Sequence, residues 1–395
     1  MRDRPLHGLR VLISGAGVAG PAAAYWFARY GAETTVVEIA PALRTSGFRV
    51  DFRGPTHLEV LASMGVLDDL RAERTNGGAM SFVDENDVEI FELPAEFAGG
   101  DIEVRRGDLS RILYEHTKDR AEYVFGDRIT GLCETDDEVH VEFAVGPSRT
   151  VDLVVGADGI HSGIRALAFG DERNFVRHLG YYLAQWNLAN DGDATAVPRH
   201  YSVPGRMASV GADLRDPTRA SAMVAFASPR LEPGRGNLDE QKELVFDRFN
   251  DLGWRVPWLL EGLASATEMY FSAISRVRMR QWHHGRVVLL GDAGYGVTLG
   301  GMGVGAGVVG AYILASELAL ADGDHTVALP AYQRRMRPYV GRWQRGANPG
   351  EFFAPSTVFR RKLRDTMFRT RLMRSLLVSS GKSMATTGEL PGYFD

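Results

Sequence analysis

The sequence predicts an α/β fold in which a parallel-sheet domain carries an inserted antiparallel sheet and is followed by a C-terminal helix. Three observations predict it. A short apolar run leads into the glycine cluster GAGVAG at residues 15–20, and another leads into GADG at residues 156–159. Between residues 170 and 278, short and partly alternating runs are separated by Pro, Gly and Asp. The first two patterns are typical of strand–loop–helix units, and the third is typical of antiparallel strands with one covered face.

The composition is that of an ordinary soluble chain and excludes some functional classes. The 395 residues, 45% apolar and 24% charged, are enough for two domains or for one domain with an inserted second one. A net charge of −5 gives no reason to expect a nucleic-acid partner. The single cysteine, Cys133, excludes an internal disulfide and a cysteine-cluster metal site. No uninterrupted apolar run reaches the roughly 18 residues of a membrane helix. We therefore expect a cytoplasmic protein with no metal and no membrane partner.

The first unit begins with the apolar run at residues 11–13, which leads into a G-x-G-x-x-G pattern at residues 15–20. Residues 22–29 then predict a helix. A β-branched strand at residues 34–37 follows and ends in Glu38, 18 residues after the last glycine. Strand, glycine loop, helix, strand and acid in this order are typical of a Rossmann-like dinucleotide-binding unit.

Each residue type has a physical role in that unit. Gly15 allows the tight turn, Gly17 lets the backbone approach a pyrophosphate, and Gly20 allows the helix to lie close to the strand. The helix N-terminus offers free N–H groups to the phosphates, and Glu38 is expected to accept hydrogen bonds from ribose hydroxyls. The predicted cofactor contacts here are Gly15, Gly17, Val18, Ala19, Gly20, Glu38 and Ile39. The fingerprint alone leaves both FAD and NAD open.

Three further segments extend the pattern. VDLVVGADGIHSGIR at residues 151–165 runs from an apolar strand into a glycine–aspartate loop. RVVLLGDAGYGVTLGGMGVGAG at residues 286–307 also ends a strand in Gly-Asp, and its many glycines allow the backbone to come close to a bound molecule. EVRRGDLSRIL at residues 103–113 places Arg106 at a predicted helix start.

In order and spacing, these four segments resemble the motifs of the class A FAD-dependent monooxygenases, the single-component aromatic hydroxylase family, including its natural-product-tailoring and tetracycline-inactivating members. The resemblance covers most of residues 1–320. It implies a glutathione-reductase-type, Rossmann-like domain and FAD as the bound dinucleotide. The flavin contacts that it implies in the later segments are Arg106, Asp158, Gly159, Arg165, Gly291, Asp292, Gly301, Gly303 and Val304.

The same resemblance implies how the chain is divided. The FAD-binding domain takes residues 1–75, 100–172 and 277–345, the substrate-binding sheet domain takes residues 76–99 and 173–276, and residues 346–395 form a C-terminal helical segment. The sheet is expected to cover a substrate cavity above the flavin. Candidates for its wall are Phe48, Arg49, Trp186, Met223 and Phe271, although each could equally be a core or sheet-surface residue. Arg49 is favoured because a cation near the flavin could bind a phenolate or an acid.

The third motif departs from the family pattern GDAAHxxxPxxGxGxN. Gly294 and Tyr295 stand where the pattern has Ala and His, Thr298 or Leu299 stands at the proline, and Gly305 stands at the asparagine. In the family, the proline region lies beside the edge of the flavin where oxygen reacts. FAD binding is expected to survive these changes, whereas their effect on oxygen activation stays open.

The C-terminal stretch PSTVFRRKLRDTMFRTRLMRSLLVSS predicts an amphipathic helix. Its apolar residues Phe359, Leu363, Met367, Leu372 and Leu376 recur at nearly helical spacing, and Arg360, Arg361, Arg364 and Arg371 lie between them. One interpretation is a helix that binds a membrane surface or a partner. The other, which we favour, is a capping helix whose arginines face water or nearby acids.

The resemblance implies an FAD-dependent monooxygenase that uses NADPH or NADH and O2 to hydroxylate an aromatic or polycyclic, polyketide-like molecule through a C4a-hydroperoxyflavin, in antibiotic biosynthesis or modification. No catalytic side chain is singled out, because the flavin carries the chemistry. The alternatives are a flavin-dependent dehydrogenase or reductase, a Baeyer–Villiger oxygenase, and a flavin-bound accessory protein without turnover. The expected partner is a small aromatic substrate, and the expected state is a monomer or homodimer.

Overall fold

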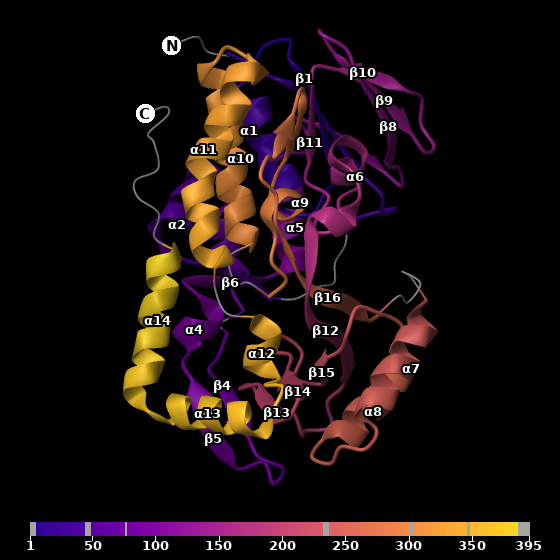
Figure 1. Cartoon of the computed structure of the whole chain (residues 1–395). Helices are drawn as coiled ribbons and strands as arrows, with labels where there is room; N and C mark the ends of the chain where they lie inside the picture. Colours follow the sequence, from indigo (N-terminus) through magenta and orange to yellow (C-terminus); the bar gives the residue numbers. More distant parts are fainter. Residues whose placement is uncertain are drawn as a thin grey trace.

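The computed structural model describes residues 5–43, 49–75, 77–231, 237–299, 303–345 and 348–385. They form two halves (Figure 1): the upper half is built on a mainly parallel sheet, and the lower half on a mainly antiparallel sheet. The chain crosses between the halves several times, so each half is assembled from segments that are far apart in the sequence.

The upper sheet has six strands in the order β17-β18-β11-β1-β2-β7. Their bounds are β1 Arg10–Ser14, β2 Glu33–Glu38, β7 Glu122–Phe125, β11 Leu153–Gly156, β17 His283–His284 and β18 Val287–Leu289. Neighbouring strands are parallel except β17 and β18. Leu12 and Ile13 in the central strand β1 are fully buried, as expected for a strand covered on both faces. Because β1 lies between β2 and β11, a crevice opens outside the carboxyl ends of these three strands.

One face of this sheet packs against three helices that run side by side in Figure 1, α1 Ala19–Arg29, α10 Gly303–Leu320 and α11 His325–Gln344. The other face is covered by α6 Gly163–Phe169 and by a small sheet of β8 Ile129–Glu134, β9 Val139–Phe143 and β10 Arg149–Val151. In length and composition α10 resembles a membrane-spanning helix, with a mean hydropathy of 1.6, but 78% of it is buried inside the protein. Such burial is typical of a core helix of a globular protein.

The lower sheet has seven strands in the order β16-β12-β15-β14-β13-β4-β5. Their bounds are β4 Met80–Val83, β5 Glu89–Leu93, β12 Val176–Ala189, β13 Arg199–Val203, β14 Arg206–Ala212, β15 Arg219–Ala227 and β16 Tyr270–Val277. Only β13 and β4 pair in parallel. One face packs on α7 Leu238–Phe249 and α8 Val256–Ser265, and the other packs on the C-terminal helices and on Leu299.

A separate antiparallel pair, β3 Arg49–Phe52 and β6 Ile102–Arg105, links the two halves. α3 Leu67–Ala72 and α5 Arg106–Glu115 pack against β6, and α4 Ala95–Gly99 packs against β3. α2 Gly54–Ser63 packs on α10. Since α5 begins directly after β6, this junction brings Arg106 to the boundary between the halves.

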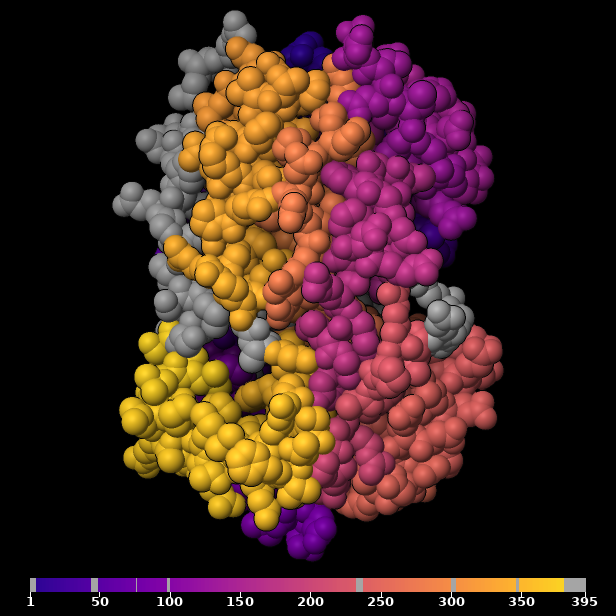
Figure 2. Space-filling view, viewed as in Figure 1, coloured from indigo at the N-terminus to yellow at the C-terminus, as the bar shows by residue number. Residues whose placement is uncertain are grey.

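The C-terminal segment forms three helices, α12 Pro349–Phe353, α13 Val358–Arg369 and α14 Arg371–Ala385, rather than one. They cover one side of the lower half, with α7 and α8 on the other (Figures 1 and 2). The extended backbone of Thr370, at φ −84° and ψ 132°, separates α13 from α14. The predicted apolar stripe points outward instead of packing, as the 75% exposure of Phe359 shows.

Arg364 pairs with an acid, as the favoured interpretation expects, but it is buried instead of facing water. Its side chain is buried, it donates to the carbonyls of Phe352 and Phe353 and to Ser202 Oγ, and it also pairs with Asp365. Its guanidinium lies 4.9 Å from the centre of the Phe82 ring. α13 is therefore anchored to the sheet by a buried cation as well as by apolar contacts.

His200 on β13 lies next to this anchor and makes folding sensitive to acid. Its imidazole is buried against the Phe82 ring, with ring centres 5.0 Å apart, and neither ring nitrogen has a hydrogen-bond partner among the described residues. Burial, assisted by the charge of Arg364, lowers the pKa of His200 to about 3. The unfolded chain therefore takes up this proton near pH 6.5, well before the folded protein does.

We expect His200→Leu to reduce the loss in free energy of unfolding that the wild type shows between pH 8 and pH 5. The stability tied to a neutral His200 is complete above pH 6.5 and is lost as the pH falls toward 3, about 2 kcal/mol of it between pH 8 and pH 5. Urea unfolding at pH 8 and pH 5 measures this difference. The exposed His140, changed to leucine, is the matched control and should keep the wild-type pH dependence. An unchanged pH dependence in His200→Leu would contradict the assignment.

Candidate functional site

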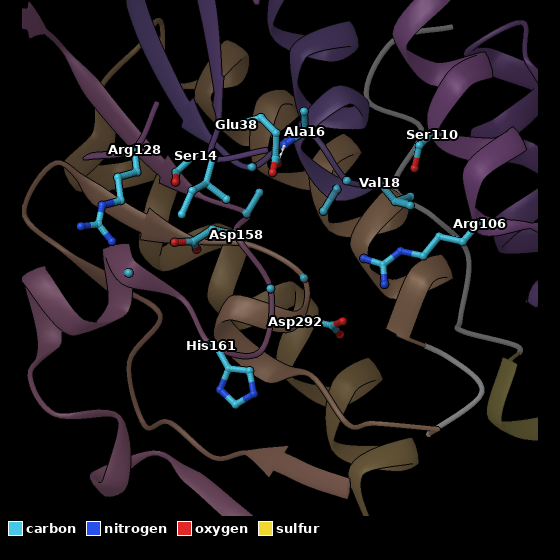
Figure 3. A pocket seen from close by; sticks show the side chains of 18 of the residues that line it. Ser14, Ala16, Val18, Glu38, Arg106, Ser110, Arg128, Asp158, His161 and Asp292 are labelled. Carbon is cyan, nitrogen blue, oxygen red and sulfur yellow. Dashed lines mark hydrogen bonds between the residues drawn. The ribbon is translucent and has the colours of Figure 1, made fainter. Parts of the chain in front are cut away.

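A large cavity of about 1230 Å³ opens outside the carboxyl ends of β1, β2 and β11 and reaches the ends of β12 and β16 (Figure 3). It is larger than the roughly 300–1,000 Å³ of most ligand pockets, so it has room for a dinucleotide. Three loops form its upper wall: the glycine loop after β1, the GADG loop after β11 and the Gly-Asp loop after β18.

The three glycines of the first loop serve different purposes. A Cβ on Gly15 would lie 2.6 Å from the Ala157 carbonyl oxygen, and one on Gly20 would lie 1.9 Å from the Gly15 carbonyl oxygen. Both glycines are therefore required by contacts within the protein. The nearest atom to a Cβ on Gly17 is Nη2 of Arg106, at 3.6 Å. Gly17 is thus the glycine that leaves the backbone open toward the cavity.

The N-terminus of α1 faces the same space without a side-chain cap. Val18 occupies the N-cap position and provides no hydrogen bond to the first turn. Free N–H groups at a helix start, together with the helix dipole, form an anion-binding site. Glu38, at the end of β2, accepts hydrogen bonds from the backbone N–H groups of Ala16 (2.8 Å) and Ala40 (3.0 Å), and Ile39 next to it is exposed at the cavity edge. The loop is thereby held against β2.

Asp158 in the GADG loop presents an acceptor that the protein leaves unused. Its Oδ2 accepts the N–H of Ile164 at 3.1 Å, whereas its buried Oδ1 has no partner within the described part of the chain. Burial raises the pKa of this carboxyl group. A buried acceptor without a donor is costly unless a ligand supplies the donor, and a ribityl or ribose hydroxyl would do so. Gly159 follows with φ +85°, which a glycine adopts without strain.

Arg106 and Asp292 face each other across the other end of the cavity. Figure 3 shows the Arg106 guanidinium pointing toward the Asp292 carboxylate. Burial raises the pKa of Asp292, and the positive charge of Arg106 opposes that shift. Asp292 begins the short helix α9, Asp292–Tyr295. A Cβ on Gly303 would lie 3.0 Å from Asp292 Oδ1, so the glycine at the start of α10 leaves space for this carboxylate.

The helices α1 and α10 meet closely at this end. A Cβ on Gly291 would lie 3.1 Å from the Ala19 Cβ, and one on Gly307 would lie 3.2 Å from it. Val304 and Gly303 also line the cavity here. Two helix starts beside one cavity give it a positive potential suited to phosphate groups.

Arg165 lies behind the cavity and does not line it. Its guanidinium is fully buried and donates to the carbonyl oxygens of Ala293 (2.8 Å) and Ile160 (2.7 Å) and to Glu172. Arg165 therefore ties the GADG loop to the loop of Asp292. This geometry corrects the predicted cofactor contact: Arg165 positions the two loops.

The described substrate candidates do not gather at one place. Trp186 and Phe271 border the cavity where β12 and β16 reach it, but the Trp186 ring is only 2% exposed and its N–H donates to the Leu259 carbonyl. Trp186 thus borders the cavity from a largely buried position under α8. Met223 pairs in register with Gln185 on the sheet face opposite α8, packed in a small cluster outside the cavity. Arg49 lines a second cavity. Phe48 and Gly301 lie outside the described residues.

Several cavity residues escaped the sequence analysis. Gln185 and Asn187 line the cavity from β12, and Arg128 lines it from the turn after β7. Gln185 Nε2 donates to Ser221 Oγ at 2.7 Å, while its buried Oε1 has no partner in the ranges that the structure describes. Two weak features of the sequence point to these residues. Arg128 lies shortly after a strand, and Gln185 and Asn187 are polar positions that alternate with apolar ones along β12.

The departures from the motif pattern at Gly305 and Tyr295 have packing explanations. A Cβ on Gly305 would lie 2.1 Å from His57 Cε1, so the His57 ring occupies the space where the pattern has an asparagine side chain. The His57 ring nitrogens contact the Arg53 N–H (3.0 Å) and the Tyr339 hydroxyl (2.5 Å). Tyr295 fills a buried space against the Trp282 ring and contacts the Tyr332 hydroxyl at 3.2 Å.

The loop after Tyr295 is fixed by the lower sheet as far as Thr298. Thr298 exchanges backbone and side-chain hydrogen bonds with Ser275 on β16, and its hydroxyl also donates to the Ala273 carbonyl. Gly296 accepts the N–H of Val277 at 2.8 Å. Thr298, one of the two residues that can stand at the proline position, therefore holds the loop by hydrogen bonds.

Comparison with known proteins agrees with this geometry. The model of the FAD binding domain family matches residues 8–342. A flavin-dependent monooxygenase of Legionella longbeachae is 35% identical over 338 residues, covering 84% of this chain and 86% of that protein. An uncharacterized protein of Mycobacterium tuberculosis is 38% identical over 341 residues, covering 85% and 91%. The crystal structure of tetracycline destructase Tet(51) has a TM-score of 0.84 at 29% identity and covers 97% of this chain and 99% of its own.

Proposed function

Because this chain belongs to the FAD-binding family of flavin-dependent monooxygenases, we propose that it uses NADPH or NADH and O2 to hydroxylate an aromatic or polycyclic small molecule. The nicotinamide gives up a hydride, one atom of O2 enters a C–H bond of the substrate, and the other leaves as water with a further proton. The observation that carries the proposal is that one continuous cavity runs from the glycine loop after β1 to Gln185, Asn187 and Phe271 on β12 and β16.

The chain's own residues suit FAD in this cavity. The open backbone at Gly17 and the uncapped start of α1 would hold the pyrophosphate, and Glu38 would accept hydrogen bonds from a ribose. Asp158 Oδ1 supplies an acceptor for a flavin-side hydroxyl. Arg106 and Asp292 would flank the flavin end of the molecule. When bound, the flavin supplies the redox chemistry, and the protein orients the substrate and excludes water.

The substrate side of the cavity is built by Gln185, Asn187 and the segment from Met269 to Phe271. The side-chain amides of Gln185 and Asn187 suit a phenolic hydroxyl, and the aromatic and apolar neighbours suit a ring system. The resemblance in structure to a tetracycline destructase supports a polycyclic substrate. We expect a cytoplasmic protein that acts as a monomer or homodimer.

Anaerobic mixing of the FAD-loaded protein with NADPH or NADH, followed by the visible absorbance of the flavin, tests the proposal. We expect bleaching that accelerates with one member of a panel of polycyclic phenols and tetracyclines, and a product heavier by one oxygen atom once air is admitted. Bleaching that yields hydrogen peroxide alone with every compound would favour a reductase. Insertion of oxygen next to a ketone would identify a Baeyer–Villiger enzyme. Flavin that binds and never bleaches would contradict the proposal.

A further inference from the structure

A second cavity, of about 220 Å³, lies beside the turn between β14 and β15. Its described wall carries four arginines and no carboxylate. The lining residues are Arg49, Arg74, Thr75, Arg105, Leu214 and Arg215. They come from β3, from the segment after α3, from β6 and from the β14–β15 turn, so four separate parts of the chain converge. We refer to it as the arginine cavity.

Acidic side chains hold these guanidinium groups without lining the cavity themselves. Arg215 donates to Glu73 at 2.5 Å and to Asp108 at 2.9 Å, and Arg105 pairs with Asp213. Burial raises the pKa of Asp213, but the hydrogen bond from the backbone N–H of Arg215 and the positive charge of Arg105 outweigh it. The pKa of Asp213 therefore lies below its usual value. These ion pairs fix the directions of the Arg105 and Arg215 guanidinium groups, while the described cavity wall itself carries arginines and no carboxylate.

Arg49 is held in the same way. Glu103, itself bonded to the Thr75 hydroxyl at 2.6 Å, lies 3.5 Å from Arg49 Nη1. The side chains of Arg49, Arg105 and Arg215 are 33%, 36% and 39% exposed, so the cavity is open to solutes. A guanidinium has five N–H donors, and Arg49 and Arg105 each contact their acid through one nitrogen. Donors therefore remain for a ligand.

An anion with several oxygens is the ligand that such a wall fits. The planar fork of arginine matches the oxygens of a phosphate in pairs. The volume lies below the roughly 300–1,000 Å³ of a complete ligand pocket, so it suits one phosphate group of a larger molecule.

The location connects this cavity to the flavin end of the large one. Arg105 is followed directly by Arg106, which lines the large cavity, so both cavities share the junction of β6 and α5. A nicotinamide dinucleotide has to approach the flavin from outside and leave again. Its one phosphate monoester, a dianion near neutral pH, is the 2′-phosphate that distinguishes NADPH from NADH.

We propose that the arginine cavity binds the 2′-phosphate of NADPH and thereby selects NADPH over NADH. The inference rests on the proposed function, because that function requires a nicotinamide reductant. It adds the choice between the two reductants and assigns it to four arginines outside the large cavity.

Calorimetric titration of the FAD-loaded protein with adenosine 2′,5′-bisphosphate tests the inference without turnover. Adenosine 5′-monophosphate, which lacks the 2′-phosphate, should bind at least about tenfold more weakly to the wild type. Arg49→Gln and Arg215→Gln should each weaken bisphosphate binding roughly tenfold, the usual effect of losing a charge-assisted hydrogen bond. Arg71→Gln is the matched control: it removes the same charge from the nearby helix α3 but lies outside the cavity, and it should bind normally.

The outcomes separate this inference from the proposed function. If the wild type and the three glutamine variants bind the bisphosphate equally well and NADPH still reduces the flavin, the inference about the arginine cavity is wrong. The proposed monooxygenase function is then unaffected. Weakened binding in the two cavity variants, with flavin that NADPH never reduces, would support the anion site and refute the function. Salicylate titrations distinguish a second source of anion: if the variants lose salicylate binding but keep the bisphosphate, the site serves an acidic substrate and the inference fails. Arg215→Lys keeps the charge for the case that Arg215→Gln folds poorly, and it should still show a several-fold loss.

Discussion

Replacing Gly17 by alanine is expected to weaken FAD binding by about 100-fold, which corresponds to about 2.7 kcal/mol, while the apoprotein stays as stable as the wild type. The added methyl group would meet only Arg106 Nη2 at 3.6 Å, an ordinary contact, so the fold accepts it. Gly17 is not in the left-handed backbone region, and alanine there also restricts the unfolded chain. The same methyl group stands where the pyrophosphate has to approach the loop.

Fluorescence quenching of added FAD measures the affinity, and urea unfolding of the apoprotein measures the stability. Gly253→Ala is the matched control, because a Cβ there meets nothing within 4 Å and the site is remote from the large cavity. Gly20→Ala provides the contrasting case: its Cβ would lie 1.9 Å from a backbone oxygen, so we expect loss of both stability and FAD binding. If Gly17→Ala binds FAD like the wild type, the glycine loop is not the pyrophosphate site.

Restoring the family's asparagine by Gly305→Asn is expected to destabilise the protein by about 3 kcal/mol, the upper range for overfilling a packed core. The new Cβ would lie 2.1 Å from His57 Cε1 inside the contact between α2 and α10. The His57 ring cannot move without losing the Arg53 N–H and the Tyr339 hydroxyl. Thermal and urea unfolding of the variant measure the loss.

A double-mutant cycle with His57→Ala tests the cause. Alanine at position 57 removes the ring that collides with residue 305, so the double variant should be at least about 1 kcal/mol more stable than the sum of the single effects predicts. Strictly additive effects would show that His57 does not occupy the asparagine space. FAD binding by the double variant then reports whether the missing asparagine matters to the cofactor.

The flavin-binding unit could be predicted because its structure depends on residues that are close together in the sequence. Strand, glycine loop, helix and acid follow each other between residues 10 and 40, and the backbone of that loop accepts only certain residue types at Gly15 and Gly20. The antiparallel strands between residues 170 and 278 could also be predicted, because alternation of apolar and polar residues is a local signal.

Side-chain directions could not be predicted in the same way. Trp186 and Gln185 are neighbours in the sequence, yet Trp186 packs under α8 while Gln185 bonds to Ser221 on the other face of the sheet, because successive residues of a strand point to opposite faces. Arg165 has the motif position of a cofactor contact, but the Ala293 carbonyl, 128 residues away in the chain, holds it behind the loop.

The sequence by itself determined that this protein carries a dinucleotide fingerprint, a second sheet and the motifs of an FAD-binding monooxygenase, because each of these is a short pattern with its own backbone geometry. Only the tertiary structure decided that His57 fills the space at Gly305, that Arg364 is a buried anchor, and that Arg49 and Arg215 face one cavity. The physical reason is that a side chain's neighbours come from distant segments, and their positions depend on how the whole chain packs.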